Sequence, residues 1–301
     1  MAKIMAVNAG SSSIKFQLLE MPQEEVITSG IMEKIGTTIN GENVPGIFTI
    51  KYNGKKDETN PVLVDHAVGV ELLLKALVEK GIVKSLEEIT GVGHRVVQGG
   101  EFFDDSCLVD EEVIQKISDL SALAPLHNPA HVVGIKAFQK ALPNVPQVVV
   151  FDTTFHQTMA PEAYMYATPY EWYTKYGVRK YGFHGMSHKY VSNRAMELLD
   201  RDLGNVVVCH LGQGGSISAV RDGRCINTTM GFTPLDGVIM GTRSGSIDPS
   251  IIEYICKCKK ISINECIEIL NKESGVFGIS EVSSDIRDLL EAKSEGNKKA
   301  A

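Results

Sequence analysis

Two short loops of small residues constrain the fold of this chain most. One is VNAGSSSIKF at residues 7–16, and the other is HLGQGGSISAV at residues 210–220. Each follows an apolar β-type run and leads into another strand, so each predicts a tight turn at a strand end. The backbone N–H groups of small residues can approach an anion closely because no side chain intervenes. Two such turns, in corresponding places of the two halves, predict a duplicated fold that holds a polyphosphate in a cleft between its halves.

Length and charge narrow the classes of protein. The chain has 301 residues, and at roughly 100–200 residues per domain this predicts two domains. A formal net charge of −7 without a basic block argues against a nucleic-acid partner. The longest apolar runs, such as residues 145–151, have strand length, which argues against a membrane partner.

The N-terminus and the cysteines favour a cytoplasmic location. The chain enters a strand almost at once, without the pattern of a secretory signal. Its six cysteines are scattered, as is typical of reduced thiols. Cys256 and Cys258 lie two residues apart in a helical stretch and therefore do not share a face, which disfavours a metal pair.

The hydrophobic pattern predicts an α/β protein. Strands are expected at residues 3–7, 14–19, 46–52, 89–97 and 147–151, and helices at residues 65–80, 110–123 and 129–141. The second half predicts an antiparallel meander at residues 205–210, 216–220 and 224–228, then helices at residues 249–257, 262–272 and 283–298. After its first helix the first half has two further strands and the second half has none. We therefore expect domains at residues 1–152 and 153–301, the second incomplete.

Asp152 and Arg95 each follow or end a predicted strand. Asp152 comes directly after the apolar run VPQVVVF, where ligands gather in open α/β sheets. It could orient a metal–phosphate or accept a proton, and it could equally cap a turn. Arg95 precedes a glycine-rich turn and could hold a carboxylate or phosphate, or form an ordinary surface pair.

Three further positions are candidates for anion or metal binding. Arg243 lies between glycines in GTRSG, which indicates a rigid loop directed at an anion, or a turn with a solvated arginine. His184 and His188 are four residues apart, which is the spacing of a zinc pair on a helix. Gly185 indicates instead a loop at His184, with that imidazole donating to a phosphate. Lys15 could serve as a phosphate-binding lysine or be an exposed strand residue, because the P-loop spacing is absent.

Taken together, these segments strongly resemble the acetate kinase family, part of the superfamily of sugar kinases, actin and the heat-shock ATPases. In chain order, and from about residue 3 to residue 288, they are VNAGSSSIKF, GHRVVQGGEFF, APLHNPAH, VVVFDTTFHQTM, YGFHGMSH, HLGQGGS, NTTMGFTPLDGVIMGTRSGSIDP and SGVFGISEVSSDIRD. The resemblance implies two ribonuclease H-like domains that flank a cleft. It also implies reversible, Mg²⁺-dependent phosphoryl transfer from ATP to acetate, which gives acetyl phosphate and ADP, and a homodimer formed through the second domain.

The resemblance also implies roles for individual residues. Arg95, Asp152, His184 and Arg243 would be catalytic, with Arg95 also binding substrate. The acetate methyl group would contact a cup formed by Val97, Leu126, Phe183 and Pro234. ATP would contact Ser11, Ser13, Lys15, His210, Leu211, Gly212, Gln213, Gly214, Asp285, Ile286 and Arg287, and Mg²⁺ would be on the side of Asn8.

Three features depart from the family pattern. The second small-residue loop has Gln213 where the family usually has Asn, and the first arginine motif has Gln98 where His is usual. The chain also ends before the family's glycine-rich adenosine loop, its late metal-binding Glu and its final helix. Three alternatives therefore stay open: a propionate or butyrate kinase, an inactive fragment that binds small acids or phosphate, and, least favoured, a zinc hydrolase built on His184, His188 and Asp152.

Overall fold

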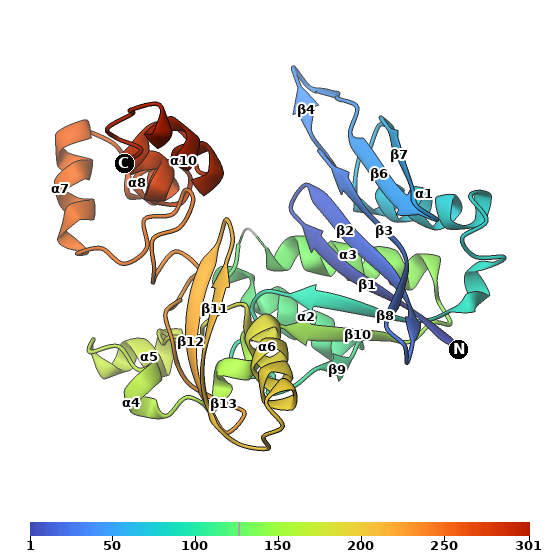
Figure 1. Cartoon of the computed structure of the whole chain (residues 1–301), viewed down its shortest axis with the longest axis horizontal. Coiled ribbons are helices and arrows are strands. Elements are labelled where there is room, and N and C mark those ends of the chain that lie inside the picture. The colour runs from blue at the N-terminus through green and yellow to red at the C-terminus, as the bar shows by residue number, and fades with distance from the viewer. Residues whose placement is uncertain (126) are drawn as a thin grey trace. The chain divides into compact units, whose positions relative to one another are not determined.

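The computed structural model describes residues 1–125 and 127–301 (Figure 1). The chain divides into two compact units, Met1–Thr154 and Phe155–Ala301. Each unit combines a β-sheet with helices, which confirms the predicted α/β class. The predicted domain limits at residues 152 and 153, and the ribonuclease H-like character of each domain, stay predictions.

The first unit is built on a sheet whose strands follow the order β7-β6-β3-β2-β1-β8-β10-β9. Strands β1, β8 and β10 are parallel to one another, and the other neighbours are antiparallel. A separate pair is formed by β4 (Thr38–Ile39) and β5 (Glu42–Asn43). The strands of the main sheet are β1 (Ala2–Gly10), β2 (Ser13–Met21), β3 (Glu25–Glu33), β6 (Ile47–Tyr52), β7 (Lys55–Thr59), β8 (Ile89–Val96), β9 (Cys107–Leu108) and β10 (Gln147–Phe151).

The helices of the first unit are α1 (His66–Glu79), α2 (Glu111–Asp119) and α3 (Asn128–Ala141), with short 3₁₀ turns at Leu86–Glu88 and Leu120–Ala122. Asp65 and Asp110 cap α1 and α2, each accepting a hydrogen bond from the backbone N–H three residues on. Alternate residues of the strands, among them Met5 and Phe16, form one core with Leu73 and Leu77 of α1 and Phe138 of α3. The opposite residues of β1, β2, β3 and β6 face away from that core and carry polar side chains such as Lys15 and Gln17.

Gly30 of β3 is required by close packing. A methyl group at Gly30 would lie 2.4 Å from the carbonyl oxygen of Thr49 and 2.5 Å from the ring of Phe16. The Phe16 ring therefore occupies the space that a side chain at residue 30 would take. This strand was not among the sequence predictions, because the glycine interrupts the run of strand-forming residues.

The second unit has an antiparallel sheet in the order β11-β12-β13, and α6 packs against β11. The strands are β11 (Asn205–Leu211), β12 (Gly215–Arg221) and β13 (Arg224–Thr228), as the predicted meander requires. The helices are α4 (Pro161–Tyr164), α5 (Tyr170–Tyr176), α6 (Gly185–Leu198), α7 (Ser250–Lys259), α8 (Ile263–Lys272), α9 (Gly275–Ser280) and α10 (Ile286–Ser294), after a 3₁₀ turn at Thr154–Thr158.

Between β13 and α7 the backbone forms a long loop, residues 229–249, without regular structure. Backbone hydrogen bonds tie it to the helical segment that follows: Ser274 N–H donates to Thr242, Val276 N–H to Met240, and Phe277 N–H to Gly241. The predicted helix at residues 283–298 is shorter than expected, because Asp285 caps it at its start and Glu295 ends it. None of the described helices is both long and apolar enough to cross a membrane.

Candidate active site

Arg95 and Asp152 form a two-pronged ion pair at the carboxyl ends of two neighbouring parallel strands. Arg95 lies opposite Val150 in the β8–β10 register, and Asp152 directly follows β10. Arg95 Nε donates to Asp152 Oδ1 at 3.0 Å, and Nη2 donates to Oδ2 at 2.6 Å. The Asp152 side chain is buried, whereas the Arg95 side chain keeps 32% of its surface exposed. The pair therefore fixes the guanidinium plane and leaves part of it open to a ligand.

The hydrogen bonds of Arg95 leave room for an anion. A guanidinium has five N–H groups; two of Arg95 reach Asp152, and one on Nη1 points to Asn8 Oδ1 at 3.4 Å. One N–H on each terminal nitrogen is left for a carboxylate or phosphate. Burial acts to lower the pKa of Arg95, but the hydrogen bond and charge of Asp152 outweigh it and raise that pKa. The guanidinium thus stays charged.

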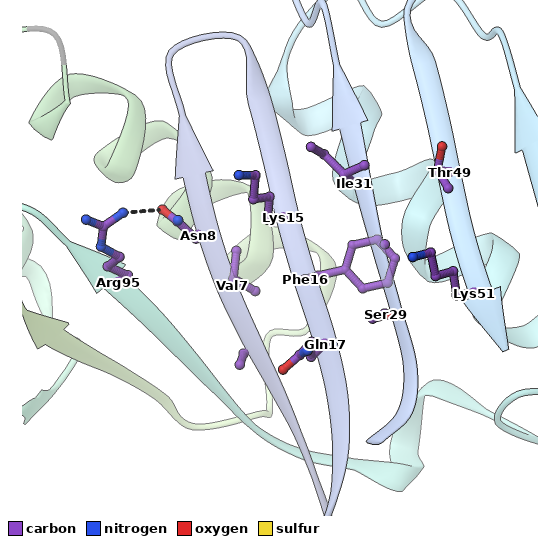
Figure 2. Close-up of a pocket in the computed structure, with 12 residues that line it drawn as sticks. Val7, Asn8, Lys15, Phe16, Gln17, Ser29, Ile31, Thr49, Lys51 and Arg95 are labelled. Atoms are coloured by element: carbon purple, nitrogen blue, oxygen red, sulfur yellow. Dashed lines mark hydrogen bonds between the residues drawn. The ribbon is translucent and has the colours of Figure 1, made fainter. Parts of the chain in front are cut away.

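A groove of about 560 Å³ lies on the open face of the first unit's sheet, over β1, β2, β3 and β6 (Figure 2). Lys15 lies directly opposite Asn8 across the β1–β2 pair, and Figure 2 shows both beside Arg95. Lys15, Lys51 and Arg95 all line the groove, and no carboxylate is among its lining residues. The groove thus presents positive charge to a ligand. Ser11 lies in the β1–β2 turn directly after β1, and Ser13 begins β2.

His184 precedes α6 with a left-handed backbone, at φ 61°. Such a conformation is costly for a non-glycine residue and often marks a functional position. The neighbouring backbone is held in place because His156 Nε2 donates to the carbonyl oxygen of Phe183 at 3.0 Å. The predicted loop at His184 is therefore correct, and His188 lies in the first turns of the helix.

The imidazoles of His188 and His210 lie close to that of His184. His184 Nδ1 lies 2.8 Å from Ser216 Oγ, and His188 Nε2 lies 2.7 Å from the same hydroxyl. The ring of His210 stacks on that of His184, with the centroids 4.0 Å apart and the planes at 26°. His210 Nδ1 is in turn 2.8 Å from Ser187 Oγ. The spacing of His184 and His188 thus brings both rings to one serine.

Arg243 lies beside His184 in the second unit. A methyl group at Gly214 would lie 3.2 Å from Arg243 Nη1 and 3.6 Å from His184 Cε1. Arg243 Nη1 donates to the carbonyl oxygen of Pro234 at 3.2 Å, and among the described residues no carboxylate forms an ion pair with it. Burial lowers the pKa of Arg243. A half-buried guanidinium without a counter-charge is suited to receive an anion.

The glycine-rich loop between β11 and β12 continues this surface. Leu211, Gly212 and Gln213 are exposed, and Gly212 N–H donates to the carbonyl oxygen of Gly214 at 3.0 Å, which makes the turn tight. Gln213 Oε1 covers Gly241, where a methyl group would lie only 2.3 Å from that oxygen. The longer side chain at this departure from the family pattern therefore packs on the Arg243 loop.

The structure gives other predicted site residues local contacts of their own. Asp285 caps α10 and forms an ion pair with Arg287. The hydrogen bonds from Arg287 lower the pKa of Asp285 to about 2. The neighbouring Ile286 is exposed. Their predicted contact with ATP stays a prediction. Gln98 is fully buried, and its Oε1 accepts from Gly100 N–H at 2.9 Å. This second departure therefore stabilises the glycine turn after Arg95.

The predicted methyl cup is only partly described. Val97 in the first unit and Phe183 in the second are buried at 4% and 2% exposure. Pro234 is half-buried beside Arg243. Leu126 lies outside the described residues. The sequence predictions missed Ser216, which contacts the His184 ring, and His156, which holds the backbone before it. The one signal for Ser216 was its small polar side chain at a core-facing position of β12.

The two residues that the resemblance places near Mg²⁺, Asn8 and Asp152, both contact Arg95. Both oxygens of Asp152 are engaged by Arg95, and Asn8 Oδ1 faces the same cation. In the part of the chain that is described, no group of three or more His, Cys, Asp or Glu side chains is placed to hold a metal. Mg²⁺ is commonly held by substrate phosphates and water with few protein ligands.

Comparison with known proteins decides the family. Residues 3–301 match the model of the Acetokinase family. The acetate kinases of Geobacillus sp. (strain WCH70) and Bacillus subtilis (strain 168) are each 57% identical to this chain over 302 residues, covering 100% of it and 75% of their own length. The chain belongs to the acetokinase family. Acetokinases are phosphotransferases, so the chain is assigned to that class of enzyme.

Solved structures agree with the assignment to the acetokinases. The crystal structure of Porphyromonas gingivalis acetate kinase matches with a TM-score of 0.94 at 42% identity, over 100% of this chain and 75% of that one. A propionate kinase from Francisella tularensis matches with a TM-score of 0.93 at 43% identity, with the same coverage. The predicted family and the α/β fold class are thereby confirmed.

Proposed function

We propose that this chain is an acetate kinase, which transfers the terminal phosphoryl group of MgATP to acetate and releases acetyl phosphate and ADP. The observation that carries this proposal is Arg243, a half-buried cation that lies beside His184 and a glycine-rich loop. Within residues 1–125 and 127–301, no carboxylate forms an ion pair with it. Such a constellation suits a transferring phosphoryl group, because the reaction needs positioning and charge neutralisation more than covalent chemistry.

The proposed step balances without an added acid or base. A carboxylate oxygen of acetate attacks the terminal phosphorus; the new O–P bond forms as the bond to the bridging oxygen breaks, and ADP leaves with that electron pair. Arg243 would neutralise charge on the transferring group, and His184 would donate a hydrogen bond to one of its oxygens. Arg95, oriented by Asp152, would hold the acetate carboxylate. Lys15, Ser11, Ser13 and the loop at residues 210–214 would contact phosphates, and Mg²⁺ would arrive with ATP, on the side of Asn8.

The test is the formation of acetyl phosphate, trapped as the hydroxamate, with acetate and MgATP. R243A and R95A should lower kcat/KM at least 100-fold. R194A is the matched control, because Arg194 is an exposed helical arginine that pairs with Glu197, and it should stay within twofold. A loss below tenfold in R243A would reject the role given to Arg243.

The acyl chain is a second question, raised by the Francisella tularensis propionate kinase at 43% identity. One methylene in an apolar cup is worth about 1–3 kcal/mol, so discrimination is modest in either direction. Comparing kcat/KM for acetate, propionate and butyrate decides between them. A higher value for propionate than for acetate would replace the proposed substrate.

Location and assembly are also proposals. We place the chain in the cytoplasm, supported by six cysteines that are all free thiols. We infer a homodimer through the second domain, in line with the family resemblance. Light scattering coupled to gel filtration measures the mass of the particle, and a mass near 32.8 kDa, that of one chain, would exclude the dimer.

A further inference from the structure

Ser216 connects two histidines in the second unit. It is the second residue of β12, and none of its surface is exposed. Its hydroxyl oxygen lies 2.8 Å from His184 Nδ1 and 2.7 Å from His188 Nε2. His188 is also fully buried, whereas His184 is half-buried. The three groups thus run from the interior of the unit to the ring that is open to a ligand.

A serine hydroxyl has one proton and two lone pairs. It can donate to one of the two imidazole nitrogens and must accept from the other. If Ser216 donates to His184 Nδ1, then His188 Nε2 carries a proton and donates to Ser216. In that arrangement neutral His184 carries its own proton on Nε2, the nitrogen remote from Ser216.

We propose that Ser216 is a positioning residue for His184: it holds the imidazole in the Nε2–H tautomer and in the ring orientation that directs this N–H to the phosphoryl group. This inference rests on the proposed function for its catalytic consequence. His188 acts through Ser216, as the donor that directs the serine proton to His184. Neither residue touches substrate.

Two other contacts at His184 have different effects. The stack with His210 fixes the plane of the ring, and the His156 hydrogen bond to the Phe183 carbonyl fixes the backbone before it. A stacked imidazole can still flip by half a turn about χ2, since this torsion has two-fold character. Such a flip exchanges nitrogen and carbon positions, and the hydrogen bond to Ser216 selects one of the two orientations.

Kinetics test the catalytic consequence. S216A should lower kcat by about 10- to 100-fold with KM for acetate and MgATP changed less than threefold. S218A is the matched control, because Ser218 is equally buried on the same strand but is 2.8 Å from Thr228 Oγ1. In an H184A background, S216A should cause no further loss of kcat. Equal losses in S216A and S218A, or a full additional loss in the H184A background, would overturn the inference.

A spectroscopic test does not need turnover. Long-range ¹H–¹⁵N correlation spectra report which imidazole nitrogen carries the proton. At neutral pH, His184 should be the Nε2–H tautomer in the unaltered chain and in S218A, and a mixture of tautomers in S216A. An unchanged His184 spectrum in S216A would refute the positioning role. Absence of acetyl phosphate formation by the unaltered chain would refute the proposed function alone, because the spectra would still decide the role of Ser216.

Discussion

Replacing Asp152 by asparagine isolates the ion pair with Arg95. Asparagine keeps the size of the side chain and one acceptor oxygen, but its amide N–H₂ then faces a guanidinium N–H. The backbone hydrogen bond from Asp152 N–H to the Val96 carbonyl is unaffected. Arg95 makes two hydrogen bonds to Asp152, at 3.0 Å and 2.6 Å. The variant therefore removes the negative charge and one of these two hydrogen bonds.

The structure sets the size of the effect. Breaking a fully buried ion pair costs about 3–5 kcal/mol. The Arg95 side chain keeps 32% exposure, so water can solvate the freed guanidinium in part, and we expect D152N to lower the free energy of unfolding by about 2–3 kcal/mol. This corresponds to a roughly 30- to 150-fold change in the unfolding equilibrium. For a unit of this size the melting temperature should fall by about 5–10 °C.

Calorimetry measures the shift in melting temperature, and hydrogen exchange read by mass spectrometry reports protection in β8 and β10 directly. The control is E79Q, which breaks the Lys75–Glu79 pair in the same unit; those side chains are 65% and 63% exposed, and we expect less than about 0.5 kcal/mol. A D152N shift no larger than that of E79Q, with exchange in β8 and β10 unchanged, would refute the energetic account of the pair.

Three further predictions concern titration, thiol reactivity and backbone strain. Burial lowers the pKa of His94 and His131 to about 4, although the hydrogen bond to Gln147 opposes this in His94. The value in the unfolded chain is about 6.5, so the unfolded chain binds more protons between these two values. The free energy of unfolding should therefore fall by about 1 kcal/mol per pH unit for each histidine as the pH is lowered from 6.5 to 4. Denaturant midpoints across that range measure the slope, and H131N should reduce it by about half of the joint contribution; an unchanged slope would contradict the assignment. Burial raises the pKa of Cys225 to about 12, so native-state alkylation followed by mass spectrometry should label exposed Cys209 and spare Cys225, and equal labelling would be the contrary result. Gly275 has φ 62°, and a methyl group there would lie 2.2 Å from the carbonyl oxygen of Met240 and 2.6 Å from that of Arg243. G275A should therefore lower the free energy of unfolding by at least about 1–3 kcal/mol and reduce acetyl phosphate formation. A melting curve and a hydroxamate assay that both match the unaltered chain within error would disprove this.

Residue patterns were sufficient for most regular elements. Apolar runs predicted β1 and β11, and alternation of apolar and polar residues predicted β6. The strand β3 was missed, since Gly30 is favoured there by the ring of Phe16 on the neighbouring strand. Packing between strands, which the local sequence does not record, decides that position.

The candidate site shows the same division between local and distant information. Glycine neighbours singled out Arg95 and Arg243, but the contact between Arg95 and Asp152 joins residues 57 positions apart and follows from the pairing of β8 with β10. Ser216 is 32 residues from His184 and 28 from His188. Such long-range contacts arise only once the strands and α6 have packed, so the residues that orient the site were harder to find than those that would touch the ligand.

The groove beside Arg95 also bears on how an acidic protein meets small anions. The chain carries a formal net charge of −7, which repels anionic solutes at long range. At physiological ionic strength the screening length is about 8 Å, so this repulsion fades within a few water layers of the surface. An anion that comes near Lys15, Lys51 and Arg95 then experiences chiefly their attraction. The rate at which the groove binds an anion should consequently depend on attraction over the last few ångströms. Low ionic strength should lower this rate, because the repulsion by the net negative charge then reaches further from the surface.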